Sequence, residues 1–545
     1  MCGFVGVIEK GSHFPHINDM LGEIAHRGKD EKDFYLKGEL CMGHNRLSII
    51  DPENGHQPFE YGDWVIVFNG CVYNFKDFSD SNSDTEAIAQ AIHEHGIGIV
   101  EKFNGMFAIV AHNVKTDETY LIRDRYGIKP LYYWSNDDVF LFGSEVKSFM
   151  QHPAFKVEVD TEALQEYFTF QNTISSLTLF KGVRELKNGS YMQISNRRVT
   201  KYWEWNFKEG GHGKYSARKT TKYLLKQAVE RQLISDAPLG AYLSGGIDSG
   251  SIVAFAGKVP TFTCGFNMKG VEGREAHFDE SESARKMASD FGCDNYNKQI
   301  SKHHIENLEK IVWHLEDLKL GMSYPLYEAS NMASKHVKVC LSGAGGDELF
   351  GGYVWRYKPE IYDYFQYWNR LGDVEFTFPK TDHPRRVFYE HFADNQGHIT
   401  FNREKAYNFE ANTFLQGVLT CGDKLAMANT LEERFPFLDN DLVDYAQTMP
   451  EDLKVDKMVL RDAMKGILPE EVLNAKKQGF SAPDENWYRN NKYISNLLTD
   501  RRSEEFIPQS CVDRILKEHN EGKNHRLLIW SLMSFETWCN LFLDK

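Results

Sequence analysis

The sequence predicts a two-part protein, with an α+β domain built on antiparallel sheets followed by an α/β domain with a mostly parallel sheet. The first part contains short apolar runs separated by polar turns and one clear helical segment, Thr85 to Glu94. Such a succession of strands is typical of layered antiparallel sheets. In the second part strands and helices alternate, which is typical of a parallel sheet covered by helices. A length of 545 residues allows roughly two to four domains.

Four apolar runs predict strands of the first domain, which we expect to cover residues 1–205: Trp64 to Phe68 (ending at Asn69-Gly70), Met106 to Ala111, Tyr120 to Ile122 and Val139 to Phe142. The glycine-rich stretch Lys208 to Gly213 predicts a linker, placed at 206–214, and a second domain at 215–545. Alternating patterns predict that domain's elements: helix Thr220 to Ile234, strands Leu239 to Leu243 and Thr261 to Phe266, helix Glu280 to Phe291, strand Val337 to Leu341 and the final helix Leu527 to Leu543.

Composition excludes several classes of protein. The net charge is -15, with 63 basic and 78 acidic side chains, which argues against a broad basic face and therefore against a nucleic-acid partner. No apolar run approaches the roughly 18 residues that a membrane span needs, so we expect no membrane partner. Nine cysteines without paired spacing indicate thiols in a reducing compartment. The start lacks a basic leader, and we predict a cytoplasmic protein.

Cys2 is the first residue with a chemical interpretation. Removal of the initiator methionine leaves it with a free α-amine whose pKa is about 7.7–8.0, so a useful fraction is neutral near pH 7. That amine can take the thiol proton and generate a thiolate nucleophile. The alternative is that Cys2 only packs at the start of a strand. Ordered downstream segments favour the nucleophile: 25–28 (AHRG), 45–51 (NRLSIID), Asn69-Gly70, Tyr73-Asn74, Ser83-Asp84 and 123–127 (RDRYG).

These segments resemble the signature of class II, N-terminal-nucleophile glutamine amidotransferases over the whole first domain. The resemblance implies a four-layer αββα sandwich with Cys2 as the catalytic residue. Arg46 is suited to binding the α-carboxylate of glutamine bidentately, and Asp84 to pairing with its ammonium. Asn69 and the backbone N–H of Gly70 are suited to stabilising the oxyanion that forms when the thiolate attacks the amide.

Two positions depart from this family pattern. Cys71 stands where the family usually has Glu after Asn-Gly, and Lys29-Asp30 stands where Pro-Asp is usual. Cys71 therefore belongs to the predicted glutamine-binding set without supplying a carboxylate. Asp84 is then expected to provide more of the attraction for the glutamine ammonium. We predict a raised Michaelis constant for glutamine. Cys71 itself lacks an adjacent free amine and is not expected to be the nucleophile.

A glycine turn after the strand Leu239 to Leu243 predicts a phosphate site. In 244–249 (SGGIDS), a strand, a turn and a helix start bring several backbone N–H groups to one point, which binds an anion. Ser244 and Ser249 add hydroxyls, and Asp248 can hold Mg²⁺. The loop lacks the Gly-Lys-Ser/Thr of γ-phosphate-transferring NTPases and resembles that of ATP pyrophosphatases. The alternative is a chance glycine turn. The predicted ATP-binding residues here are Leu243, Ser244, Gly245, Gly246, Asp248 and Ser249.

A second loop, 342–353 (SGAGGDELFGGY), resembles the second ATP and substrate loop of asparagine synthetases. The blocks 423–424, 432–439, 457–461 and 477–480 complete that resemblance. It implies that Asp347 is a second Mg²⁺ ligand, that Ser342 and Gly343 contact nucleotide, and that Leu243 and Cys264 line the adenine pocket. Lys457 is predicted to stabilise charge on the α-phosphate and the acyl-adenylate; the alternative is a solvated helix lysine.

The combined resemblance implies glutamine-dependent asparagine synthesis, with ATP and Mg²⁺ as cofactors and glutamine, aspartate and ATP as partners. A homodimer is kept as a candidate assembly. Ala344 is the main departure, because these synthetases often carry an acidic residue there; Glu348 and Glu316 are candidate substitutes. Ala344 keeps open an amidotransferase that acts on another carboxylate, such as one on a sugar, a peptide or a metabolite. A catalytically lapsed regulatory homologue is the third interpretation.

Overall fold

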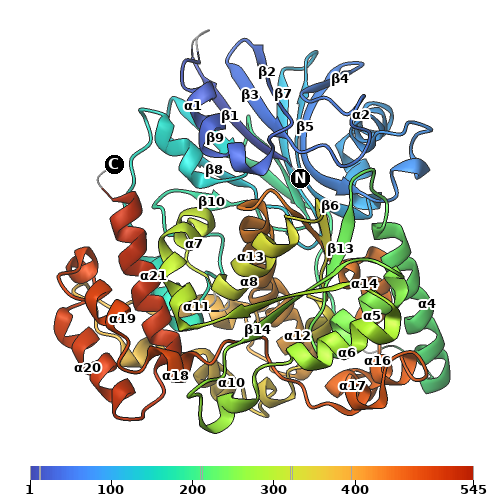
Figure 1. Ribbon diagram of the computed structural model, residues 1–545. Helices are drawn as coiled ribbons and strands as arrows, with labels where there is room; N and C mark the ends of the chain where they lie inside the picture. Colours follow the sequence, from blue (N-terminus) through green and yellow to red (C-terminus); the bar gives the residue numbers. More distant parts are fainter. Residues whose placement is uncertain are drawn as a thin grey trace.

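The computed structural model describes residues 2–10, 14–208, 210, 213–319, 321, 323–394 and 396–543. The chain forms two domains, with the strand-rich N-terminal part above the C-terminal part in Figure 1. The predicted linker lies partly outside the described residues, at 209, 211 and 212. Its described start is anchored, since Phe207 is buried and its N–H donates to Asn408 Oδ1 at 3.0 Å. The helix that follows already begins at Lys214.

Two six-stranded sheets make up the first domain, and all their strand pairs are antiparallel. One sheet has the order β10(Arg184–Glu185)-β8(Tyr132–Ser135)-β9(Val139–Gly143)-β1(Gly3–Glu9)-β3(Leu40–Arg46)-β2(Glu31–Lys37). The other has the order β12(Arg198–Lys201)-β11(Ser190–Gln193)-β7(Glu118–Arg123)-β6(Gly105–Asn113)-β5(Trp64–Val72)-β4(Phe59–Tyr61).

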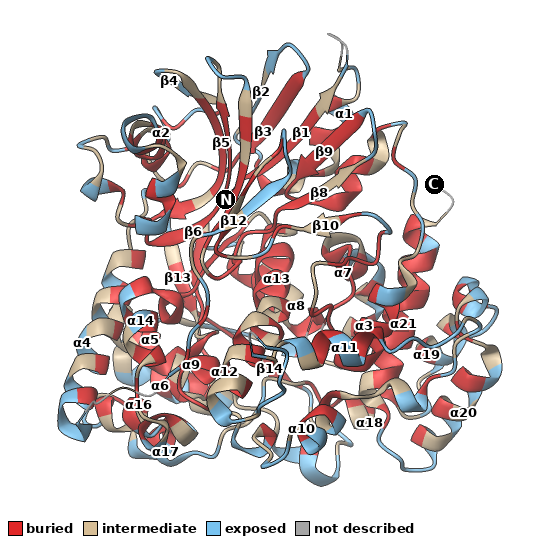
Figure 2. Ribbon diagram, turned by 180° about the vertical axis from the view of Figure 1, so that it is seen from behind, coloured by how far each residue is buried: buried red, intermediate tan, exposed pale blue. Residues whose placement is uncertain are grey.

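The two sheets pack face to face through alternate apolar side chains such as Phe4, Met42, Val67 and Val110. Helix α1 (Ile17–Glu23) covers the outer face of the first sheet, and α2 (Asp84–His95) covers the outer face of the second. The predicted four-layer αββα sandwich is confirmed. Figure 2 shows both sheets largely buried, with exposure concentrated in loops and at the outer edges.

A five-stranded parallel sheet organises the second domain, in the order β15(Asn295–Ile300)-β14(Thr261–Phe266)-β13(Leu239–Tyr242)-β16(Val339–Leu341)-β17(Glu432–Arg434). The predicted α/β architecture is confirmed. Its longer helices are α4 (Lys214–Gln232), α5 (Ile247–Ala256), α6 (Ser281–Phe291), α7 (Leu308–Leu315), α8 (Ser323–Ala333), α10 (Ile361–Trp368), α11 (His383–Glu390), α12 (Arg403–Asn412), α13 (Phe414–Met427), α14 (Asn440–Gln447), α20 (Gln509–Asn520) and α21 (Arg526–Phe542). Shorter helices complete it: α9 (Gly346–Leu349), α15 (Glu451–Lys454), α16 (Met458–Ala463), α17 (Glu470–Asn474), α18 (Asp484–Tyr488) and α19 (Lys492–Leu497). The ten-residue helix α3 (Thr161–Phe170) lies at the domain junction.

Two strands differ from the sequence prediction. The predicted end of the strand at Asn69-Gly70 is wrong, because β5 continues to Val72 and stays paired with β6. Glycine is required at position 70, where an added Cβ would lie 2.0 Å from the Met106 carbonyl oxygen. Strand β17 was not predicted, since three charged residues in a row do not suggest a buried strand. No described helix combines the length and the apolar character that a membrane span requires.

Candidate active site

The first pocket surrounds Cys2 where the two domains meet, and we call it the Cys2 pocket. The end of β3, the middle of β5, the start of α2 and strand β17 supply its walls, and it encloses about 360 Å³. Its lining residues are Cys2, Arg46, Leu47, Ile49, Ile50, Gln57, Phe68, Gly70, Cys71, Asp84, Thr85, Glu432 and Arg434. Four predicted glutamine-binding residues and Cys2 therefore come together, although they are far apart in the chain.

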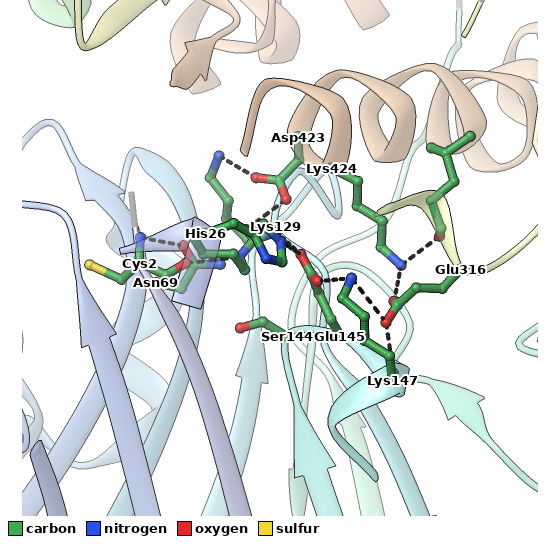
Figure 3. Close-up of polar contacts among 12 residues, drawn as sticks. Cys2, His26, Asn69, Lys129, Ser144, Glu145, Lys147, Glu316, Asp423 and Lys424 are labelled. Carbon is green, nitrogen blue, oxygen red and sulfur yellow. Dashed lines mark hydrogen bonds and ion pairs between the residues drawn. The ribbon is translucent and has the colours of Figure 1, made fainter. Parts of the chain in front are cut away.

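Cys2 is held by its backbone. Its nitrogen donates to Asn69 Oδ1 at 3.2 Å, and its carbonyl oxygen accepts from Arg27 Nε at 3.0 Å (Figure 3). Asn69 Nδ2 is buried and has no hydrogen-bond partner among the described residues, so an amide donor is left free next to the nucleophile. Burial raises the pKa of the Cys2 thiol. The thiol is therefore protonated at rest, and attack requires a base to take its proton.

Arg46 lines the pocket but its guanidinium is already engaged. Nη1 donates to Glu31 Oε1 at 2.6 Å and to the Pro52 carbonyl at 3.0 Å, while Nη2 donates to the Asp51 carbonyl at 2.7 Å. Strand pairing fixes the first contact, because Glu31 on β2 is the register partner of Arg46 on β3. A ligand carboxylate at Arg46 has to share this guanidinium with Glu31.

Asp84 and Cys71 form the opposite wall. Asp84 is the first residue of α2, where its Oδ2 accepts from the Val72 N–H at 3.4 Å. Burial raises the pKa of Asp84 to about 7, and the nearby Glu432 carboxylate adds to the increase. Burial also holds the pKa of the Cys71 thiol well above its usual value. Cys71 is thus an inert part of the wall, and Asp84 is half-protonated near neutral pH until a cation arrives.

The second pocket lies at the carboxyl ends of the parallel strands, and we call it the glycine-loop pocket. It spans about 1440 Å³ including the space at its open mouth. Adjacent strands β13 and β16 carry the two glycine loops to the same edge of the sheet. Eight predicted residues line it: Leu243, Ser244, Asp248, Ser249, Cys264, Ser342, Gly343 and Asp347. Gly245 and Gly246 form the turn that leads into α5, and Gly246 is the N-cap of that helix. Neither glycine lines the pocket.

Lysines hold the two predicted metal ligands together. Lys457 Nζ bridges Asp248 and Asp347, at 2.5 Å from the latter, and Lys477 Nζ lies 2.5 Å from the other Asp347 oxygen. Burial and the Asp347 charge raise the pKa of Asp248 against the pull of Lys457. Burial alone would raise the pKa of Asp347 too, but Lys457 and Lys477 outweigh it and lower that pKa to about 2. Lys457 is buried, so the alternative of a solvated lysine is wrong.

The carboxylate pair fits Mg²⁺ in its chemistry. Asp248 Oδ1 is buried and has no hydrogen-bond partner in the described part of the chain, which leaves an oxygen for a cation. No cluster of three or more potential metal ligands occurs among the described residues. Mg²⁺ in ATP sites is usually held by one or two carboxylates, with phosphate oxygens and water as further ligands. Asp248 and Asp347 match that arrangement once a nucleotide is present.

Strand β17 separates the two pockets. Its alternate side chains point to opposite faces. Glu432 and Arg434 line the Cys2 pocket, with Arg434 Nε donating to Glu432 Oε1 at 2.6 Å. Glu433 lines the glycine-loop pocket. The sequence block 432–439 was noted only as a resemblance, and the roles of these three residues were missed. Their segment, Glu-Glu-Arg, has the composition of an exposed turn, so the local sequence carried no signal for these roles.

A second connection between the domains is a buried network of charges (Figure 3). Arg27 donates to Glu145 at 2.8 Å and to Asp423 at 2.7 Å, and Lys129 donates to Asp423 at 3.1 Å. The network continues through three more fully buried side chains, Lys147, Glu316 and Lys424, with Lys424 Nζ 2.6 Å from Glu316. Because Arg27 also holds the Cys2 carbonyl, this network ties the nucleophile to α13 of the second domain.

Comparisons with known proteins agree with this geometry. Residues 220–540 match the family model described as asparagine synthase, and residues 1–204 match that of a glutamine amidotransferase domain. The chain belongs to the asparagine synthase family. It is 32% identical to asparagine synthetase (glutamine-hydrolyzing) 1 of Bacillus subtilis, with 100% of this chain and 97% of the relative covered. It is 28% identical to a putative asparagine synthetase of Mycobacterium tuberculosis (100% and 98% covered) and 27% identical to asparagine synthetase 3 of B. subtilis (94% and 92%).

Within this family, position 344 is the departure with the most direct consequence. Ala344 lines the glycine-loop pocket and offers no carboxylate there. Glu348 lines the same pocket, and its Oε1 accepts from the Tyr353 hydroxyl at 3.0 Å. Glu316 does not line it, because its carboxylate accepts from the Val146 and Lys147 N–H groups in the buried charge network. Glu316 as a substitute for the residue at 344 is therefore wrong.

Proposed function

We propose that this protein is a carbon–nitrogen ligase that makes asparagine from aspartate, with glutamine as nitrogen donor and ATP as energy source. The observation that carries the proposal is the pairing of a Cys2 pocket and a glycine-loop pocket on opposite faces of β17. One pocket has the groups for releasing ammonia, and the other has the groups for activating a carboxylate. The family membership supports aspartate as that carboxylate.

Glutamine hydrolysis is proposed for the Cys2 pocket. After removal of Met1, the α-amine of Cys2 accepts the thiol proton, and the thiolate attacks the side-chain amide of glutamine. The oxyanion receives hydrogen bonds from Asn69 Nδ2 and the Gly70 N–H. Ammonia leaves, and water hydrolyses the thioester to glutamate. Arg46 and Asp84 bind the carboxylate and the ammonium of the substrate.

Carboxylate activation is proposed for the glycine-loop pocket. The loops 244–249 and 342–346 bind the phosphates of ATP through backbone N–H groups and hydroxyls. Attack of the aspartate side-chain carboxylate on the α-phosphorus gives an acyl-adenylate and releases pyrophosphate. Asp248 and Asp347 hold Mg²⁺, which neutralises phosphate charge when it is bound. Lys457 moves from its carboxylate partners toward the α-phosphate as that charge develops.

Transfer of ammonia then takes place past β17, the wall that both pockets share. Consecutive residues of this strand face the two pockets, which makes it their common wall. Attack of ammonia on the acyl-adenylate gives asparagine and AMP. The alternative of a lapsed homologue is not favoured, because Cys2, Asn69, Asp84, Asp248 and Asp347 all occupy the two pockets or hold their residues.

A product assay tests the proposal. Wild-type protein with glutamine, aspartate, ATP and Mg²⁺ should form asparagine, glutamate, AMP and pyrophosphate. Cys2→Ala should lose formation from glutamine and retain formation from ammonium chloride. A panel of other carboxylates, including uronic acids and peptides, should not replace aspartate in stimulating pyrophosphate release. If another carboxylate does so and aspartate does not, the acceptor assignment is wrong.

A further inference from the structure

The glycine-loop pocket, which Ala344 lines, contains a further carboxylate that neither the motifs nor the comparisons assign. Glu433 is the middle residue of β17 and is buried, with 4% of its surface exposed. It lines the pocket together with Ala344, Ser342 and Gly343. The Ser342 N–H donates to the Arg434 carbonyl at 2.8 Å, so the second glycine loop starts directly alongside Glu433.

The surroundings of Glu433 fix its carboxylate toward the loop. The Ser342 hydroxyl, in the loop directly after β16, hydrogen-bonds it. On the other side lies Gly422 of α13, which also lines the pocket. A Cβ added to Gly422 would lie 2.9 Å from Glu433 Oε2. Glycine at 422 thus leaves the space that the carboxylate occupies, and both neighbours hold it at the pocket wall.

We infer that Glu433 is the general base for the step in which ammonia attacks the acyl-adenylate, replacing the acidic residue absent at Ala344. This assignment rests on the proposed function and deepens it. β17 is the wall past which ammonia leaves the Cys2 pocket, and Glu433 is its one residue facing the acceptor side. A base at this position meets the nitrogen as it arrives, whereas Glu348 is engaged by Tyr353.

The step balances without a further reactant. The ammonia lone pair forms the C–N bond, and the electrons of the acyl C=O move to oxygen. The Glu433 carboxylate takes one proton from the resulting N–H₃⁺ group. Collapse of the intermediate breaks the bond from carbon to the phosphate oxygen, and that electron pair leaves with AMP. The products are the amide, AMP and protonated Glu433, which returns its proton to solvent.

The charged and titratable groups around Glu433 suit this role. Burial raises the pKa of Glu433 to about 7, and the Ser342 hydrogen bond and Lys129 oppose the increase while Asp423 adds to it. Cys340 of β16 and Tyr242 of β13 also face it, and burial keeps both neutral by raising their pKa values. A base whose pKa lies near the working pH is unprotonated in a large fraction of the molecules and is still basic enough to accept a proton.

The test compares Glu433→Gln with wild type in the full-length protein, using aspartate, ATP, Mg²⁺ and ammonium chloride. We expect amide formation to fall by about 10²-fold or more, since general-base removal typically costs that much. Glutamine hydrolysis and the single-turnover burst of pyrophosphate should remain. At a constant concentration of free NH₃, the rise in amide formation as pH increases through about 7 should disappear in the variant. Ala344→Glu combined with Glu433→Ala should recover part of the rate.

Asp484→Asn is the matched control. Asp484 is likewise buried, accepts from a hydroxyl (Tyr324 Oη, 2.6 Å) and has its pKa raised by burial to about 7, but it does not line either pocket. It should keep amide formation. Amide formation by Glu433→Gln within twofold of wild type would overturn the assignment, as would loss of the pyrophosphate burst. A wild type that releases no pyrophosphate with aspartate overturns the proposed function itself.

Discussion

The Cys2 pocket and the glycine-loop pocket share one strand but are built in opposite ways. The first is small, and its polar groups are fixed by other protein groups: Asn69 by the Cys2 nitrogen, Arg46 by Glu31 and Asp84 by a backbone N–H. The second has about four times the volume, 1440 against 360 Å³, and the carboxylates of Asp248 and Asp347 in it are held by the amines of Lys457 and Lys477. The polar groups of the first pocket are thus fixed by protein groups, whereas in the second pocket Asp248 and Asp347 are balanced by lysines and Asp248 Oδ1 has no hydrogen-bond partner among the described residues.

This difference indicates how the two sites respond to substitution. A prebuilt site depends on the framework behind it, so changes outside the pocket should affect it through stability and positioning. A site in which lysines balance the charge of paired carboxylates should tolerate distant changes and respond to substitutions of those charges. Substitutions on the Cys2 side test the first of these two expectations.

The largest effect is expected for Glu145→Gln in the buried charge network. Glu145 pairs with Arg27 and Lys147, and the three side chains are fully buried. Removing its charge breaks two buried ion pairs and leaves Arg27 with Asp423 alone and Lys147 with Glu316 at 3.6 Å, and breaking a buried pair typically costs about 3–5 kcal/mol. We expect a clear shift to lower denaturant in unfolding and a loss of glutaminase activity, since Arg27 holds Cys2. Glu158→Gln, whose pair with Lys181 is exposed, should show no measurable shift. Equal stability of both variants would contradict a role for the network.

Asn69→Asp should lower kcat for glutamine hydrolysis by about 10²–10³-fold. The variant keeps an acceptor for the Cys2 nitrogen but loses the unpaired Nδ2 donor, and loss of one oxyanion donor typically has this effect. Asparagine formation from ammonium chloride should stay at the wild-type rate. If both activities fall together, Asn69 acts on the fold rather than on the oxyanion.

The sequence was a good guide to the residues of both pockets and a poor one to the wall between them. Known motifs indicate the chemistry of Cys2, Asn69, Gly70 and Asp84, and the strands around these residues carry continuous apolar runs. Strand β17 has neither a motif of known chemistry nor an apolar run. Its Glu-Glu-Arg segment has the composition of an exposed turn, and only the sheet order, with β17 beside β16, shows that it is buried.

Lys457 illustrates a second limit of sequence reasoning. Its carboxylate partners lie more than 100 residues away in the chain, and its own backbone is left-handed, with φ at +57°. That conformation breaks the helical run, and the side chain reaches Asp248 and Asp347. No local pattern predicts it, because the conformation is fixed by backbone hydrogen bonds to the loop after Asp347, including Lys457 N–H to the Phe350 carbonyl at 3.0 Å.

The pH dependence of glutamine use should report on Asp84. Its carboxylate must be ionised to pair with the substrate ammonium, and its pKa is about 7 in the free protein. As pH falls through 7 the group protonates, so kcat/KM for glutamine should decrease by up to about tenfold per pH unit. The Cys2 amine also titrates nearby, at about 7.7–8.0. Asp84→Asn isolates the contribution of the Asp84 carboxylate. Its kcat/KM for glutamine should be lower at every pH and should not show the decrease that wild type shows as pH falls through 7. If the decrease near pH 7 is unchanged in this variant, it comes from titration of the Cys2 amine.

The smallest effect is expected at Cys71, where the family usually has Glu. The thiol lies in the pocket wall near Asp84 and Glu432, so Cys71→Glu would place a third carboxylate in a closed space. Attraction for the glutamine ammonium is then offset by like-charge repulsion, which raises the pKa of Asp84 further. We expect KM for glutamine to fall only a few-fold, and only above pH 7. Cys71→Gln has a similar size without the charge and should not lower KM. If the two variants behave alike, the missing carboxylate does not limit glutamine affinity, and the prebuilt pocket already compensates for it through Asp84.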